Sequence, residues 1–419
     1  MSANLGNNLD PWLSAYAERA HTLSVSEVRA LFAVVSRPEV VSLAGGMPYV
    51  SALPKELLEK SYTSLMAKKG DLAIQYGGGQ GDLTLRDQVR ELMALEGIRS
   101  SVEDIVMTTG SQHGLELLSG LFIDEGDVVL AEGPSYVGAL GIFRHYQAHV
   151  EHVYTDQDGM SPEALEEAID RLKEAGRTIK FLYLVPNFAN PSGVTLAAER
   201  RPRILEICRK HHILVLEDNP YGLLYFDKPV PDALRSMDEE GVIYLGSFSK
   251  ILAPGFRVGY VLAPPAIKDK LVLAQESAIL CPSSFSQMMI SEYLLNSDWQ
   301  GQIDTFRGVY RERKDAALGA MREFLPKLHT TQPDGGFYLW VTLPDGVDSK
   351  AMLPLAVKEL VAYTPGTAFY GDGTGQNKLR ICYSYPTPER IRLGIQRLAS
   401  VINLQTELLD TFGTKGAAN

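Results

Sequence analysis

Short apolar runs alternate with amphipathic helical stretches from about residue 100 onward, and this alternation constrains the fold more than any other feature of the sequence. The runs are four to six residues long, rich in leucine and β-branched side chains, and begin at Asp104, Asp127, Phe181, Ile213, Val242 and Val258. Strands buried on both faces of a sheet have this composition. Between two of them, Ser161-Pro162 precedes Leu165, Ile169 and Leu172, which indicates a capped helix with one apolar face. The pattern predicts an α/β fold with a mostly parallel sheet flanked by helices.

The composition changes after about residue 295, which suggests a second structural unit. A long charged helix is expected from Trp299 to Phe324, followed by a strand from Gly336 to Val341 and a mixed segment to about residue 404. We therefore expect a small α+β domain at 296–404 beside a large domain at 61–295. Residues 1–60 are expected to form an arm and helix that pack with the small domain, and residues 405–419 a loose tail.

Composition and charge narrow the classes of function. Of the 419 residues 45% are hydrophobic and 22% charged, and no stretch is apolar for long enough to span a bilayer. These values exclude disordered, fibrous and membrane-spanning classes. With 51 acidic and 40 basic residues the net charge is -11, which disfavours nucleic acid as a partner. Three widely spaced cysteines and the lack of a basic or apolar leader before Arg19 predict a cytoplasmic protein.

Polar residues gather directly after five of the predicted strands. Ligands of open α/β sheets bind beyond the carboxyl ends of the strands, where loops and helix N-termini converge. We therefore expect these segments to line one pocket. They are residues 110–112, 132–136, 186–191, 217–221 and 246–250.

Three of these segments suggest chemistry, each with an ordinary structural alternative. Ser111 at a helix N-terminus suits a phosphate, although a simple N-cap has the same appearance. Lys250 and Arg257 could act as an amine nucleophile and a phosphate ligand, or lie on the surface as solvated cations. Asp218 ends an apolar run and needs a partner, which could be a protonated ring nitrogen, an internal arginine or a helix N-terminus.

No metal site is expected. His145 and His149 have the i, i+4 spacing of metal ligands, but no third acidic ligand lies nearby in the sequence, so surface or interface histidines are the simpler interpretation.

Taken together, the motifs resemble the pyridoxal-phosphate enzymes of fold type I, aminotransferase class I/II, and within it the 2-aminoadipate and kynurenine aminotransferase subgroup. Ser-Phe-Ser-Lys at 247–250 and Glu-Asp-Asn-Pro-Tyr at 217–221 are examples, and all the motifs occur in the family's order between residues 26 and 400. The other segments are 42–48, 75–77, 110–112, 190–193, 253–257, 365–370 and 379–380. Such an ordered set is specific, which no single motif would be.

The resemblance implies pyridoxal 5'-phosphate as cofactor and a role for each matching residue. Lys250 would bind the cofactor covalently and act as general base and acid, with Asp218 on the ring nitrogen. Tyr221 and Asn190 would bond the ring's 3-oxygen, and Tyr136 would stack on the ring. The phosphate would be held by Ser111, Gln112, Ser247, Ser249 and Arg257.

The same resemblance implies substrate contacts and a homodimer. Arg380, with Asn190, would bind the α-carboxylate, and Gly45 and Gly46 would approach the substrate. Tyr76 would reach the phosphate of the neighbouring subunit. The substrate side chain would meet Ser26 and Arg29, although Arg29 could equally be a solvated helix arginine. The chain departs from the family pattern at Ala189, Ser192 and Asn219.

The resulting hypothesis is an aminotransferase that moves the amino group of an L-amino acid to a 2-oxo acid by a ping-pong route. Donors implied by the resemblance are 2-aminoadipate, glutamate, aromatic and branched-chain amino acids. A pyridoxal-phosphate β-lyase or decarboxylase is the alternative, and Arg380 argues against it. A ligand sensor fused to a DNA-binding module is a poorer reading, because fewer than 45 residues precede the fold and they are not basic.

Overall fold

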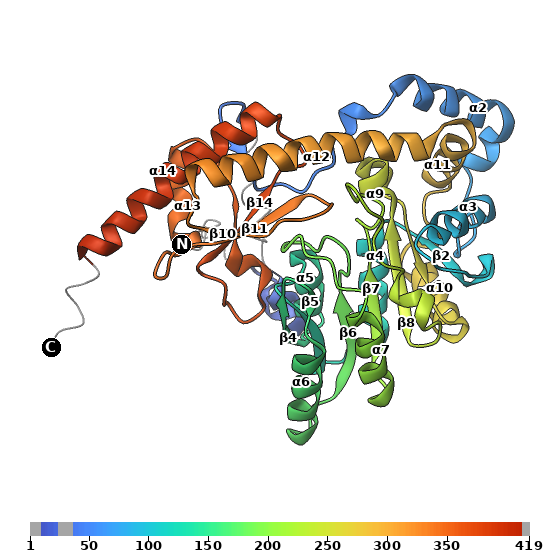
Figure 1. Cartoon of the computed structure of the whole chain (residues 1–419). Helices are drawn as coiled ribbons and strands as arrows, with labels where there is room; N and C mark the ends of the chain where they lie inside the picture. The colour runs from blue at the N-terminus through green and yellow to red at the C-terminus, as the bar shows by residue number, and fades with distance from the viewer. Residues whose placement is uncertain (1–9, 24–36, 413–419) are drawn as a thin grey trace.

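The computed structural model describes residues 10–23 and 37–412, which form a large and a small unit (Figure 1). The large unit is built on an eight-stranded sheet in the order β2-β9-β8-β7-β6-β3-β4-β5. Adjacent strands from β8 to β4 pair in parallel, and β9 and β5 are antiparallel to their neighbours. The strands are β2 (Ile105–Thr108), β3 (Val128–Gly133), β4 (His149–Asp156), β5 (Gly159–Met160), β6 (Ile179–Leu184), β7 (Leu214–Asp218), β8 (Val242–Ser247) and β9 (Gly259–Leu262). The predicted mostly parallel sheet and its six predicted strands are confirmed.

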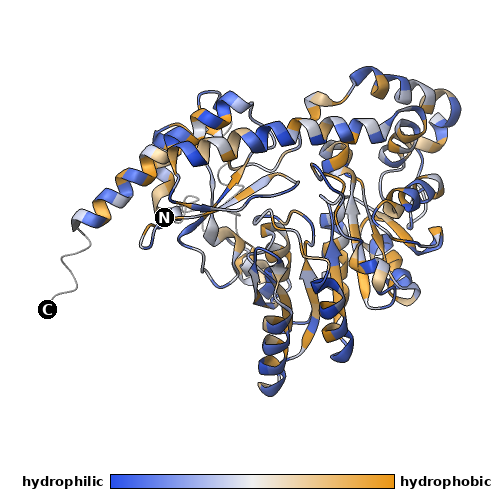
Figure 2. Cartoon of the chain, in the orientation of Figure 1, coloured by the Kyte–Doolittle hydropathy of each residue, from blue (hydrophilic) through white to orange (hydrophobic). Residues whose placement is uncertain are grey.

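Successive side chains of each strand point to opposite faces of this sheet, where helices cover them. Phe181 and Tyr183 of β6 pack with one group of helices, and Leu182 and Leu184 pack with another. The first group includes α4 (Ser111–Phe122), α5 (Val137–His145) and α10 (Pro265–Ile279), and the second α6 (Pro162–Glu174), α7 (Arg200–Lys210) and α8 (Leu234–Met237). Figure 2 shows the consequence, since the strands are mostly hydrophobic and the helices carry polar residues along their outer sides.

The cap predicted for α6 is present, because Ser161 accepts a hydrogen bond from the backbone N–H of Ala164 at 3.2 Å.

The remaining helices of the large unit are α2 (Lys55–Ala73), α3 (Leu83–Ala94), α9 (Phe248–Ile251) and α11 (Ser284–Asn296). Short 3-10 turns are η1 (Leu13–Ala15), η2 (Glu18–Thr22), η3 (Val50–Ala52), η4 (Val102–Asp104), η5 (Pro254–Phe256) and η6 (Gly366–Phe369).

The small unit has an antiparallel sheet in the order β10-β11-β14-β13. Its strands are β10 (His329–Thr330), β11 (Tyr338–Thr342), β13 (Thr364–Pro365) and β14 (Lys378–Cys382), and its helices are α12 (Trp299–Phe324), α13 (Ser349–Lys358) and α14 (Pro388–Phe412). Helix α12 occupies the predicted bounds and runs from this unit to α11 of the large unit (Figure 1).

Two features bear on the predicted domain limits. Strand β1 (Val41–Ser42) pairs in parallel with β12 (Val361–Ala362), which joins the N-terminal arm to the small unit. Helix α14 continues to Phe412, so the predicted start of a loose tail at residue 405 falls inside a helix. Within the described ranges, no helix has both the length and the apolarity needed to cross a membrane.

Candidate active site

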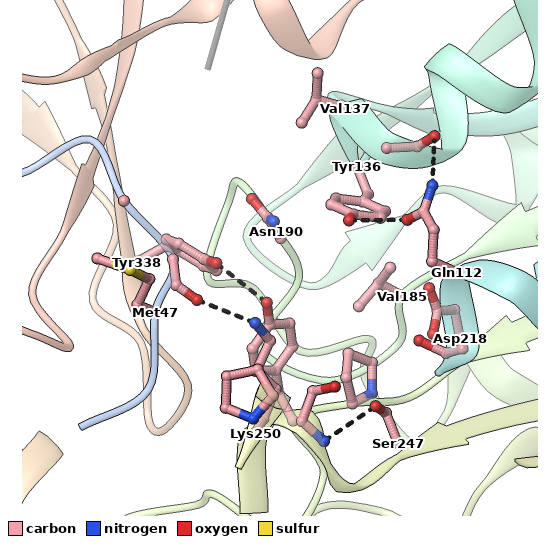
Figure 3. Close-up of a pocket in the computed structure, with 18 of the residues that line it drawn as sticks. Met47, Gln112, Tyr136, Val137, Val185, Asn190, Asp218, Ser247, Lys250 and Tyr338 are labelled. Atoms are coloured by element: carbon pink, nitrogen blue, oxygen red, sulfur yellow. Dashed lines mark hydrogen bonds between the residues drawn. The ribbon is translucent and has the colours of Figure 1, made fainter. Parts of the chain in front are cut away.

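The five polar segments predicted to meet do line one cavity, of about 520 Å³, at the carboxyl end of the parallel strands (Figure 3). The small unit and the N-terminal arm complete its wall. Thirteen of the candidate residues lie on the cavity: Gly45, Gly46, Ser111, Gln112, Tyr136, Asn190, Asp218, Tyr221, Ser247, Ser249, Lys250, Arg257 and Arg380.

Lys250 lies on the single turn of α9, directly after the buried strand β8. Its Nζ donates a hydrogen bond to the backbone carbonyl of Gly46 at 3.0 Å. Burial, together with the positive charges of Arg380 and Arg257, lowers the pKa of this amine to about 8, and Cys382 and Asp218 act in the opposite direction. An amine with such a pKa is available as a neutral nucleophile and proton acceptor near physiological pH.

Asp218 ends strand β7 at the cavity with its two carboxylate oxygens in different surroundings. Oδ2 accepts a hydrogen bond from the Tyr183 hydroxyl at 2.8 Å. Oδ1 is buried, and no donor among the described residues reaches it. Burial raises the pKa of Asp218 to about 6, while the Tyr183 hydrogen bond and the charge of Lys250 lower it. The carboxylate is thus available to a cationic N–H donor in the cavity.

The N-terminus of α4 and Arg257 form a site suited to an anion. Gly110 precedes the helix with φ 83°, and an added Cβ there would lie 2.7 Å from Nη2 of Arg257. Glycine therefore allows the guanidinium to lie against the start of the helix, where free N–H groups and the helix dipole favour negative charge. Ser111, Ser247 and Ser249 line the same cavity with their hydroxyl groups.

Tyr136 lies beside the start of α4, where a hydrogen bond from its hydroxyl and a tight contact at its ring hold it in place. The hydroxyl donates to Oε1 of Gln112 at 3.1 Å (Figure 3). An added Cβ at Gly138 would lie 2.5 Å from the ring, so only glycine fits there. Burial raises the pKa of Tyr136 to about 12, which keeps the phenol neutral.

Arg380 on β14 is 2% exposed, and the acceptors of its hydrogen bonds are all neutral. Nη1 donates to Oδ1 of Asn190 at 2.6 Å, and Nη2 to the carbonyls of Ala44 and Gly45 at 2.6 and 2.7 Å and to Thr364. Nε is buried and meets no acceptor among the described residues. The guanidinium therefore presents an unneutralised charge to any carboxylate that enters the cavity.

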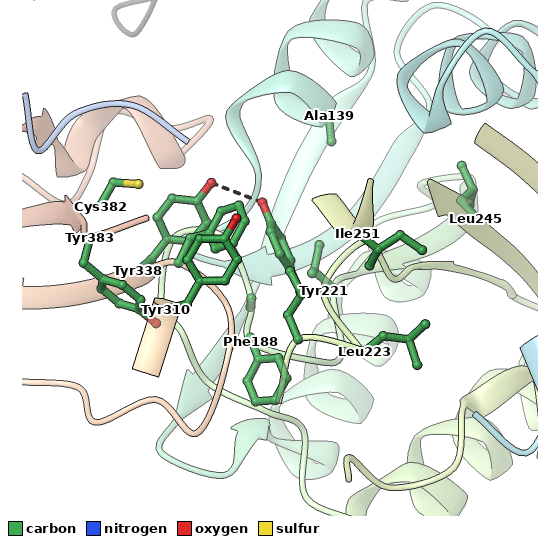
Figure 4. Packing of buried hydrophobic residues seen from close by; sticks show 14 of the residues in the cluster. Ala139, Phe188, Tyr221, Leu223, Leu245, Ile251, Tyr310, Tyr338, Cys382 and Tyr383 are labelled. Carbon is green, nitrogen blue, oxygen red and sulfur yellow. Dashed lines mark hydrogen bonds between the residues drawn. The ribbon is translucent and has the colours of Figure 1, made fainter. Parts of the chain in front are cut away.

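Tyr338 lines the cavity and was missed by the sequence analysis. Its hydroxyl lies 3.1 Å from that of Tyr221, and its ring stacks 4.5 Å from the guanidinium of Arg380 (Figure 4). The sequence carried no signal for this role, because Tyr338 shares a face of the sheet with Trp340, which lies beside Arg380 only through the register of β11 and β14. Val137, Gly138 and Val185 on the wall were also missed, whereas Met47, Pro220 and Pro254 lie in segments that the sequence analysis had singled out without naming these residues for a role.

Of the other three candidate residues, one lies on the surface and two fall outside the described residues. Tyr76 is 77% exposed on the surface of the large unit, so its predicted contact requires a second chain. Ser26 and Arg29 fall at positions 24–36, outside the described residues, and their predicted contacts stay predictions.

Comparison with known proteins adds independent information. The family model described as aminotransferase class I and II matches residues 39–398. Aromatic-amino-acid aminotransferase 1 of Thermococcus litoralis is 39% identical over 390 residues, which cover 92% of this chain and 94% of that protein. The 2-aminoadipate transaminase of Thermus thermophilus is 36% identical, with 93% of this chain and 97% of that protein covered.

Solved structures agree with these relatives. The crystal structure of Pyrococcus horikoshii kynurenine aminotransferase in complex with PMP superposes with a TM-score of 0.91 and 38% identity, covering 95% of this chain and 99% of that one. The alpha-aminoadipate aminotransferase LysN of Thermus thermophilus, complexed with N-(5'-phosphopyridoxyl)-L-leucine, gives a TM-score of 0.87 and 35% identity, covering 95% of this chain and 99% of that one.

Proposed function

The chain belongs to the aminotransferase class I and II family, and on that premise we propose which residues carry its reaction and which donors it accepts. It is a pyridoxal-phosphate-dependent transaminase that moves an amino group between an amino acid and a 2-oxo acid. A β-lyase or decarboxylase activity is not favoured, because the matched relatives are aminotransferases.

The residues on the cavity fit the cofactor by the chemistry of their donors and acceptors. Asp218 has a buried oxygen without a protein donor, and a protonated ring nitrogen supplies the donor that it lacks. Phosphate would be held by the N-terminus of α4, Gln112, Ser247, Ser249 and Arg257. Tyr136 would cover the ring, and Tyr221 and Asn190 would donate to its 3-oxygen. Lys250 would bind the cofactor aldehyde covalently.

Pyridoxal phosphate, when bound, supplies an electron sink for the charge that develops at the substrate Cα. Lys250 is the base we propose for the Cα proton, since its lowered pKa of about 8 leaves a substantial neutral fraction at neutral pH. Asp218 keeps a proton on the ring nitrogen by remaining ionised beside it. Tyr338 and Arg380 are buried in the part of the wall that the small unit contributes.

The observation that carries the proposal is the meeting of Arg380 and Lys250 in one cavity. An L-amino acid presents an α-carboxylate and an α-amine, and its 2-oxo product presents the same carboxylate. A buried arginine with only neutral acceptors can bind that carboxylate in both half-reactions. Gly45 and Gly46 bring the backbone of the arm beside both groups.

For the amino donor we propose 2-aminoadipate, glutamate, and aromatic and branched-chain amino acids. The names of the relatives, which act on aromatic amino acids, 2-aminoadipate and kynurenine, support this range. Apolar and aromatic groups of Met47, Val137, Val185 and Tyr338 on the wall suit such side chains. Arg29, with Ser26, is proposed as the partner of a side-chain carboxylate.

A homodimer in the cytoplasm completes the proposal. Exposed apolar and aromatic side chains on α2, on the segment that follows α2, and on α10 and α11 support a subunit contact there. They are Tyr62, Met66, Ile74, Tyr76, Ile279 and Phe285. Tyr76 would cross this contact to the neighbouring phosphate. All three cysteines are free, as a reducing compartment favours.

The test is a single-turnover screen in which the cofactor-loaded protein is mixed with one L-amino acid at a time. We expect the absorbance of the lysine-bound cofactor to disappear with each proposed donor, and Lys250→Ala to abolish the reaction. Failure of the wild-type protein to bind pyridoxal phosphate would overturn the proposal. If acidic donors react no faster than leucine or phenylalanine, the role of Arg29 is wrong while the rest stands.

A further inference from the structure

Tyr183 of β6 lies behind the cavity wall, and its hydroxyl is bonded to a residue of the site. Its side chain is fully buried, with its ring packed edge-on against Phe143 at 5.5 Å. The hydroxyl donates to Oδ2 of Asp218 on the neighbouring strand β7 at 2.8 Å. Tyr183 does not line the cavity, and its hydroxyl is linked to it by the hydrogen bond to Asp218.

Packing alone does not account for a tyrosine at this position. The residues beside it on the strand are Phe181, Leu182 and Leu184, all fully buried and apolar. A phenylalanine would fill the same space without the cost of removing a hydroxyl from water. The oxygen of Tyr183 is thus explained by its bond to Asp218 rather than by its contribution to the core.

We propose that Tyr183 is a positioning residue for the reaction, whose hydroxyl holds Oδ2 of Asp218 so that the carboxylate stays ionised with Oδ1 free for the cofactor's ring nitrogen. The inference rests on the proposed role of Asp218. One oxygen of the carboxylate is occupied by the protein and the other has no protein donor, so the ring nitrogen and Tyr183 do not compete.

The charges around this pair explain why the hydrogen bond is needed. Burial favours the protonated form of Asp218, and only the Tyr183 hydroxyl and the charge of Lys250 are strong enough to oppose it. Glu132 and Tyr136 also face Tyr183. Burial raises the pKa of Glu132 to about 8 and that of Tyr136 to about 12, so both are mainly neutral at pH 7 and neither stabilises a charge on Asp218.

The test is the affinity of the cofactor-free protein for pyridoxal phosphate, measured between about pH 5 and 9 for the wild type and Tyr183→Phe. Near pH 5, where a pKa about one unit higher leaves about tenfold less of Asp218 ionised, Tyr183→Phe should weaken binding about 10-fold, and above about pH 8 it should change binding little. The acidic midpoint of binding should move upward by about one pH unit, because Asp218 then needs a higher pH to ionise. A merely structural role would not move this midpoint.

Tyr363→Phe is the matched control. Tyr363 is also fully buried, and its hydroxyl donates to the carbonyl of Ser349 at 2.6 Å in the small unit. It should lose a comparable amount of thermal stability while keeping the wild-type affinity and pH midpoint. Equal pH midpoints for Tyr183→Phe and the wild type would overturn the inference, whereas absence of binding by the wild type would overturn the proposed function instead.

A second pair of variants separates positioning from general damage. In an Asp218→Asn background the carboxylate that Tyr183 is proposed to control is gone, so adding Tyr183→Phe should produce no further pH shift. A shift of the same size in this background would refute the role of Tyr183.

Discussion

Replacing Asn219 by aspartate, the residue that the family resemblance would lead one to expect, should destabilise this chain. Asn219 donates from Nδ2 to Oε1 of Glu96 at 2.7 Å and accepts at Oδ1 from Asn187 at 3.0 Å and from the N–H of Gly222 at 3.1 Å. Glu96 is 4% exposed and also accepts from the hydroxyl of Tyr244. Asn219→Asp would replace the donor that faces Glu96 by a second carboxyl oxygen.

The size of the effect depends on pH, because burial raises the pKa of Glu96 to about 7. Below that pH Glu96 keeps a proton that it can donate to the introduced carboxylate, and the free energy of unfolding should fall by less than about 1 kcal/mol. Above it, two buried carboxylates meet and the charge-assisted hydrogen bond is lost, which costs about 2–3 kcal/mol. The folded variant therefore holds a proton that the unfolded chain releases, so its stability falls as pH rises.

Urea unfolding of the cofactor-free protein at about pH 5.5 and 8.5 measures this difference. Asn296→Asp is the matched control, because Asn296 donates to Glu292 at 3.1 Å from an exposed position and should cost under about 1 kcal/mol at both pH values. Adding Glu96→Gln to Asn219→Asp places an amide N–H donor opposite the introduced carboxylate. The double variant should regain most of the free energy of unfolding that Asn219→Asp loses at high pH. A penalty for Asn219→Asp that is equal at the two pH values would refute this reasoning.

Three further predictions concern the cavity and the contact between the two units. Arg380→Lys should raise the KM for every amino donor about 10- to 100-fold in steady-state assays, because an ammonium cannot bind a carboxylate through two parallel hydrogen bonds, and an unchanged KM would contradict the role of this residue. Gly46→Ala should lower stability by about 1–3 kcal/mol in thermal unfolding, since the added Cβ would lie 2.6 Å from the Tyr338 hydroxyl. His152 bonds a carbonyl of its own unit through one ring nitrogen and accepts a backbone N–H of the small unit with the other. Burial lowers the pKa of His152 from the ordinary 6.5, so its contribution to the free energy of unfolding is complete above pH 6.5 and is lost as the pH falls below that value. In His152→Gln, the free energy of unfolding should therefore depend less on pH in this range, as urea unfolding at several pH values would show.

In the large unit the sequence predicted six strands and missed β4 and the two-residue β5. Strands such as β6 and β8 are covered on both faces, so an unbroken apolar run is their direct signature. In strand β4 His149 and Tyr154 are exposed, Val153 is buried and the other residues are intermediate, and its outer neighbour β5 has only two residues. Most of its side chains face solvent or lie near the surface, and hydropathy therefore gave no signal of a strand.

The candidate site was predictable to the extent that it follows from strand ends. In a parallel sheet the loops after successive strands must lie on one edge, so local sequence already brings Asp218 and Lys250 together. The contribution of the small unit does not follow from this rule. Tyr338 reaches the cavity only because β11 pairs with β14 in a register that single-sequence patterns do not specify. The asymmetry of Asp218 likewise depends on Tyr183, one strand away in the sheet.

The N-terminal arm supplies backbone acceptors to two cationic side chains of the cavity. Lys250 donates to the carbonyl of Gly46, and Arg380 donates to those of Ala44 and Gly45, so three successive residues of one segment stabilise cations from both units. Carbonyl dipoles satisfy the donors without cancelling the charge, which an aspartate or glutamate in their place would do. A substrate carboxylate therefore meets no competing anion at Arg380. The neutral acceptors around Arg380 thus leave its charge available to the α-carboxylate of an amino acid or a 2-oxo acid.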